Sequence, residues 1–86
     1  MAGSIDFHTF LLSLASSGMV HLGRVPDPSG QPPQVNLTLA RQTIDILLLL
    51  RDKTAGNLSP QETVLLDRLL GDLQRAYVDE AQRQAS

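Results

Sequence analysis

The side chains with the most obvious capacity for chemistry are two histidines, His8 and His21, which both fall in the first predicted helix. At 100° per residue, their spacing turns them about 220° apart around the helix axis, so one helix cannot bring both to one metal ion. The chain has no cysteine, and the ligand spacings typical of zinc sites are absent. We therefore expect the histidines to be packing residues, with no metal and no other cofactor.

Other groups that could take part in catalysis lack the neighbours that catalysis needs. Ser16 and Ser17 have no local base and no oxyanion loop, and the only lysine, Lys53, follows no glycine-rich phosphate loop. Pairs of carboxylates fall on polar helix faces, where no pocket residue would raise a pKa: Asp45 with Asp52, and Asp72 with Asp79. The sequence therefore predicts a protein that is not an enzyme.

Composition narrows the class of protein further. The 86 residues are enough for one small domain, and a hydrophobic fraction of 42% is that of a globular chain. A net charge of -2 and an aromatic fraction of 3% argue against a nucleic-acid partner. The uncharged stretch 7–23 is at the short limit for a membrane span and carries several hydroxyls, and no segment has the pattern of a targeting signal. We expect a cytoplasmic protein that does not enter membranes.

Hydrophobic periodicity and capping residues predict an all-α fold of three helices, at about 5–23, 37–55 and 60–79. Ser4 or Asp6 caps the first helix and Asn36 the second, while Ser59 with Glu62 forms a capping box for the third. Residues 5–79 then form one helical domain, after an N-terminal extension at 1–4 and before a frayed tail at 80–86.

The segment 24–35 holds four of the five prolines and therefore predicts a loop between the first two helices. A surface loop is the simpler interpretation. The alternative is a polyproline-type peptide ligand, but the segment Pro26 to Pro33 lacks the basic residue that usually orients such ligands.

Two helix faces carry more apolar or uncharged surface than a three-helix monomer needs. The back of the first helix has no charge and includes Ser13, Ser17 and Val20, while Leu48 and Leu49 interrupt the polar stripe of the second helix. We interpret these five residues as an oligomer interface, and predict a homodimeric interaction module. Two alternatives stay open: an accessory factor docking on a larger assembly or a membrane surface, and an enzyme or ligand carrier with a pocket between protomers.

The chain resembles the bacterial family called domain of unknown function 1844 over about residues 5–78. The resemblance rests on segments 6–17, 20–23, 39–47 and 53–59, followed by Glu62, Leu65, Leu66, Leu69, Leu70, Asp72 and Leu73. It departs from the family after Pro60, where Gln61, Thr63 and Val64 replace acidic residues. The resemblance implies a small cytoplasmic helical protein, and it brings no activity, ligand or catalytic residue to this chain.

Overall fold

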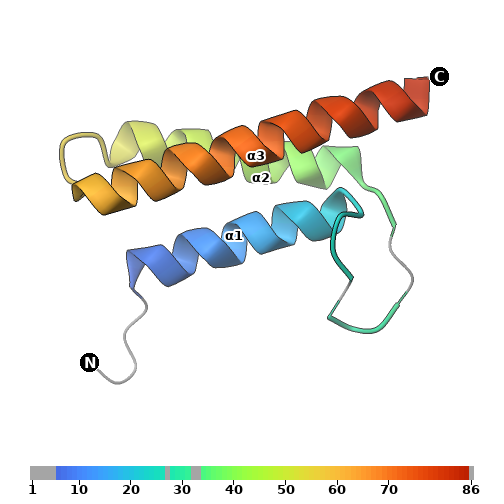
Figure 1. Cartoon of the computed structure of the whole chain (residues 1–86), viewed down its shortest axis with the longest axis horizontal. Coiled ribbons are helices and arrows are strands. Elements are labelled where there is room, and N and C mark those ends of the chain that lie inside the picture. The colour runs from blue at the N-terminus through green and yellow to red at the C-terminus, as the bar shows by residue number, and fades with distance from the viewer. Residues whose placement is uncertain (1–5, 27, 32–33, 86) are drawn as a thin grey trace.

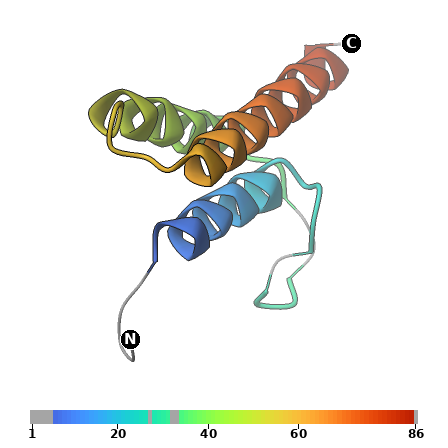
Figure 2. The ribbon, with the colours of Figure 1, turned by 60° about the vertical axis from the view of Figure 1, so that its left-hand side comes forward.

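The protein folds as three α-helices in the computed structural model, which describes residues 6–26, 28–31 and 34–85 (Figure 1). The helices are α1 (Phe7–His21), α2 (Leu37–Lys53) and α3 (Pro60–Ala85), and no strand occurs in these three ranges. The predicted all-α class is therefore confirmed. Successive helices run in opposite directions, and each one packs against the other two (Figures 1 and 2).

The first two helices begin where their capping residues predict. The Asp6 carboxylate accepts the Thr9 amide at 2.7 Å, and the Asn36 side chain accepts the Leu39 amide at 3.0 Å. Ser4, the other candidate cap, lies outside the described residues. At their C-terminal ends α1 and α2 each stop two residues before the predicted limits of 23 and 55. Gly23 follows the end of α1 with a φ of 71°, the left-handed conformation that commonly ends a helix.

The capping box at the start of α3 is confirmed atom by atom. Ser59 Oγ accepts the Glu62 amide at 3.1 Å, and Glu62 Oε1 accepts the Ser59 amide at 2.8 Å. Pro60 occupies the first helical position, where a missing N–H costs nothing. These local bonds fix where α3 begins, directly after a short turn from α2.

The core lies where the three helices meet. Its buried apolar side chains are Leu11, Ala15, Leu22, Ala40, Ile44, Leu47, Leu66, Leu70 and Leu73. Gly18 of α1 is the point of closest approach: a Cβ there would lie 2.8 Å from Leu73 Cδ2 and 3.1 Å from Thr43 Cγ2. Side chains of both neighbouring helices lie close to Gly18. Because Gly18 has no side chain, α1 can pack closely against α2 and α3.

The third helix is longer than its apolar stripe predicts. The sequence placed its end near residue 79 and a frayed tail at 80–86, whereas α3 continues to Ala85 and buries Glu80. That part of the prediction is wrong, because the contacts at this end of α3 are polar and come partly from Arg24, far away in the sequence. A hydrophobic pattern has no means of detecting them.

The described residues between α1 and α2 belong to no helix or strand. The two ends of this connection meet: the Asn36 amide donates to the His21 carbonyl at 2.7 Å, and a Cβ on Gly23 would lie 3.2 Å from Val35. A segment of this length with adjacent ends has the geometry of an Ω-loop. Arg24, the first residue of the loop, is thereby directed toward α3.

Candidate functional site

The two histidines lie apart, as their spacing predicts. His8 is exposed near the start of α1, and His21 is half-buried at its end, with Nε2 3.4 Å from Ser17 Oγ. Among the described residues, no group of three histidine or acidic side chains is arranged to hold a metal ion. His21 contributes to the fold through its backbone carbonyl, which accepts the Asn36 amide.

The predicted interface residues of α1 lie together on its outer face. Ser13, Ser17 and Val20 line a shallow, open groove of about 490 Å³. Its remaining lining residues carry no charge either: Thr9, Leu12, Ser16 and Pro28. The groove therefore combines hydroxyl groups with short apolar side chains, and it offers no base, acid or cation for chemistry.

The predicted interface residues of α2 separate from each other and from those of α1. Leu48 is half-buried in a crevice between α2 and α3, beside Ile44 and Tyr77. Leu49 is the more exposed of the two, with 56% of its surface accessible. The five predicted residues therefore do not form one continuous surface.

A different apolar surface runs along the edge where α1 and α2 meet. Leu48 faces α3, and Thr43, on the other flank of α2, faces Gly18 of α1. Leu39 and Ile46 lie on that same α1-facing flank and are 39% and 43% exposed. Phe10 lies on the flank of α1 opposite Leu12, which borders α3, and is therefore turned toward α2.

We call Phe10, Leu39, Ile46 and Leu49 the α1–α2 apolar face. Of these four, only Leu49 was among the predicted interface residues. The spacing of residues along α2 is the sequence signal that could have identified this face. The positions 39, 42, 46, 49 and 53 follow the alternating three- and four-residue steps of a coiled-coil seam, with Gln42 and Lys53 as its polar members.

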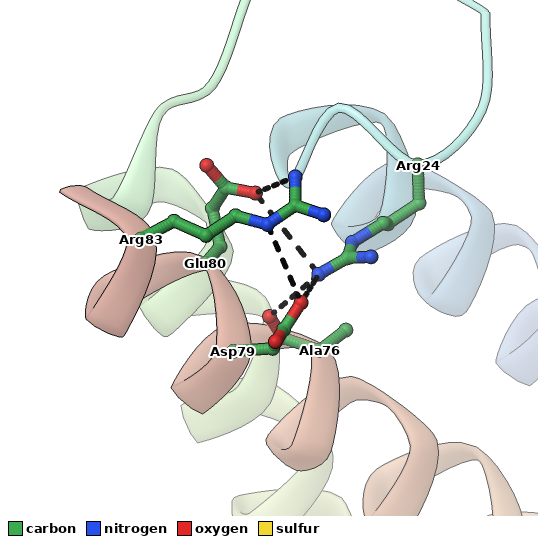
Figure 3. A network of polar contacts seen from close by, with 5 residues as sticks. All are labelled: Arg24, Ala76, Asp79, Glu80 and Arg83. Carbon is green, nitrogen blue, oxygen red and sulfur yellow. Dashed lines mark hydrogen bonds and ion pairs between the residues drawn. The ribbon is translucent and has the colours of Figure 1, made fainter. Parts of the chain in front are cut away.

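A polar cluster joins the end of α1 to the end of α3 (Figure 3). Arg24 Nη2 donates to Asp79 Oδ2 at 2.5 Å and to the Ala76 carbonyl at 3.5 Å, and lies 4.0 Å from Glu80 Oε1. Arg83 Nε lies 3.8 Å from Asp79 Oδ2, and its Nη1 lies 3.8 Å from Glu80 Oε1. Each of the two carboxylates therefore contacts both arginines, and the charges of the cluster sum to zero.

The electrostatics of this cluster favour the ionised form of Asp79. The hydrogen bond from Arg24 is the largest influence on Asp79 and holds the pKa of that carboxyl below its ordinary value, while the charges of Arg24 and Arg83 act in the same direction and partial desolvation opposes them. A carboxylate that is charged and shared between two guanidiniums is a poor proton acceptor. The cluster therefore has the chemistry of a structural contact rather than of a catalytic acid–base pair.

Fold and surface together define a small three-helix protein with one apolar edge. The family model described as "Domain of unknown function (DUF1844)" matches residues 4–80, and the chain belongs to this family. No curated protein and no solved structure matches the chain. Within the residues that the structure describes, no helix is both long and apolar enough to cross a membrane.

Proposed function

We propose that the protein is a small non-enzymatic interaction module that binds a second copy of itself through the α1–α2 apolar face. The observation that carries this proposal is the exposure of Phe10, Leu39, Ile46 and Leu49 along one edge of the bundle. Single exposed apolar residues are ordinary, whereas several of them on adjoining flanks of two helices are typical of an interaction site.

The spacing of this row favours a helix as the partner. Steps of three and four residues place side chains along one seam of α2, the pattern by which helices pack knobs into holes. Gln42 and Lys53 are polar positions within that seam, and such positions fix the register of a helix pair at some cost in stability. An antiparallel copy would place the two Lys53 side chains at opposite ends, so that they do not repel each other.

A second copy is the simplest occupant for such a face. A twofold dimer needs only one self-complementary patch, and an apolar seam with few charges is complementary to itself.

The candidate catalytic carboxylates support a non-enzymatic role, because Asp45 and Asp72 form ion pairs on the surface with Arg41 and Arg75. Each pair lies within a single helix.

The test is the solution mass of the protein and of two matched double variants. We expect the wild type to show twice the chain mass of 9.4 kDa in sedimentation equilibrium. Ile46→Lys with Leu49→Glu should reduce it to the chain mass while the circular dichroism stays helical. Val64→Lys with Val78→Glu is the control, because those residues are apolar and more than half exposed but lie on α3, and it should remain dimeric.

Two results would overturn the proposal. One is a wild type that stays at the chain mass up to millimolar concentration, which would leave the face available to a different partner. The other is a dimer that survives the α2 variant, or that is broken by the α3 control instead.

A further inference from the structure

The last turns of α3 lie beyond the hydrophobic core. At 1.5 Å per residue, the 26 residues of α3 span about 39 Å, whereas the 15 residues of α1 span about 22 Å. Figure 1 shows the end of α3 projecting past the end of α1 and the start of α2. Tyr77 is the last α3 side chain packed against the core, and Val78 is already exposed.

This projecting segment, residues 78–85, continues α3 beyond its apolar contacts with the bundle. A segment that extends a packed helix needs no new nucleus, but the end of a helix frays where no tertiary contact holds it. The buried residue of this segment is Glu80, so polar contacts contribute to its order.

Arg24 connects the segment to the turn after α1. The turn at Gly23 places the Arg24 guanidinium against the last core turn and the first projecting turn, where it reaches Ala76 and Asp79 (Figure 3). The two residues of the ion pair are 55 positions apart in the chain. Arg83, by contrast, belongs to the projecting segment itself and cannot anchor it to the bundle.

The burial of Glu80 makes this contact more than a surface ion pair. Its side chain is 11% exposed and carries a carboxylate whose cationic partners are Arg24 and Arg83. Exposed ion pairs contribute little, but a buried carboxylate that loses a partner is strongly unfavourable. Without Arg24, Glu80 keeps Arg83 as a partner but loses the partner that connects it to the turn after α1, so unwinding of the segment becomes easier.

We propose that Arg24 is a clasp that sets the length of α3 and gives this helix two states. In the clasped state α3 runs to Ala85, and in the open state it ends near Tyr77, with residues 78–85 disordered. A transition between order and disorder in one segment is a common form of conformational switch. The switch is controlled from the turn after α1, and its two states differ in the surface that the C-terminal end of the bundle presents.

Amide hydrogen exchange of residues 64–85 tests the clasp. We expect Arg24→Gln to speed exchange at residues 80–84 about tenfold or more, while residues 66–76 keep their protection, because only the local opening becomes easier. Arg75→Gln is the matched control: it removes an α3 arginine that pairs with Asp72 on the same helix and reaches no other element in the described contacts. It should leave both ranges unchanged.

A second variant separates the clasp from intrinsic helix propensity. Asp79→Ala places the best helix former near the end of a helix, so propensity alone predicts slower exchange. Loss of the Arg24 partner predicts faster exchange at 80–84. Unchanged or slower exchange there in both Arg24→Gln and Asp79→Ala would overturn the proposal, as would equal acceleration along the whole of α3.

Discussion

Gly18 shows how a single missing side chain sets the spacing of the bundle. Its hydrogen atom faces the buried Leu73 and the side chain of Thr43, so that α1 touches both other helices at one position. Gly71 of α3 offers the contrast, because the nearest atom to a Cβ there is Arg75 Nη1 at an ordinary 3.5 Å.

We expect the two alanine substitutions to have opposite effects on stability. Overpacking in a close-packed core costs about 1–3 kcal/mol, against a gain of about 1 kcal/mol in helix propensity, so Gly18→Ala should lose up to about 2 kcal/mol. Gly71→Ala should gain about 0.5–1 kcal/mol, since only propensity changes. Urea denaturation of both variants measures this, and a shift of both midpoints in one direction would contradict it.

The stability of the folded protein depends on pH through two aspartates, Asp6 and Asp79. The Thr9 amide hydrogen bond holds the pKa of Asp6 below its ordinary value, as the Arg24 hydrogen bond does for Asp79. The unfolded chain takes up these protons near pH 4, before the folded protein does. The stability from each carboxylate is therefore present above about pH 4 and is lost as the pH falls through the lower folded-state pKa.

Asp6→Asn tests this linkage without removing the cap, because asparagine is an equally good N-cap. We expect the free energy of unfolding of this variant to fall less steeply below about pH 4 than that of the wild type. Urea titrations at a series of pH values measure the slope. Asp52→Asn controls for the loss of one negative charge, and a slope in Asp6→Asn as steep as that of the wild type would show that the cap does not titrate as described.

At the scale of the helices, the reciprocal bonds of Ser59 and Glu62 define the start of α3. Ser59→Ala should lower stability by about 1 kcal/mol, because the Glu62 amide loses its acceptor. Ser59→Asp keeps an acceptor at that position and should lose much less. Thermal unfolding of the two variants distinguishes them, and equal losses would mean that the hydroxyl is not the capping group.

The helix starts were predictable because caps are local. Each capping side chain accepts a hydrogen bond from an amide three residues further along the chain, so a short stretch of sequence is enough to predict it. This holds for Asp6, Asn36 and Ser59. The continuation of α3 past residue 79 was not predictable, because the contact at that point joins Asp79 to Arg24, 55 positions away in the chain. Local patterns cannot detect a contact that the fold creates.

The sequence predicted that exposed apolar residues occur on α2, but of these residues it identified only Leu49. A helical wheel correctly shows that α2 is apolar on more than one side, yet it does not say which side faces which neighbour. The structure turns Leu48 toward α3 and leaves Leu49 exposed, although the two are adjacent in the sequence. Leu39 and Ile46 are also exposed, by 39% and 43%, and this exposure depends on how the helices pack, which a helical wheel does not show.

At the scale of the whole molecule, the two connections differ in what they must do. The turn from α2 to α3 is held by its own bonds, with Thr54 Oγ1 donating to the Leu50 carbonyl at 2.6 Å and the Asn57 amide donating to Thr54 at 2.9 Å. The connection from α1 to α2 is anchored at its two ends, and a Cβ on Gly30 would meet nothing within 4 Å. An insertion next to Gly30 therefore displaces no neighbour of that position.

Inserting Gly-Ser-Gly-Ser at each connection tests this difference. After Gly30, the insertion lengthens a loop whose ends already meet, and closure entropy predicts a loss of only about 0.3 kcal/mol. After Ala55, the same four residues separate Thr54 from Asn57 and break their bond, so that the loss should be about 1 kcal/mol or more. Urea midpoints of the two insertion variants decide the question. Equal losses would mean that the long loop holds the helices together as firmly as the short turn does, because both would then be part of the packed structure.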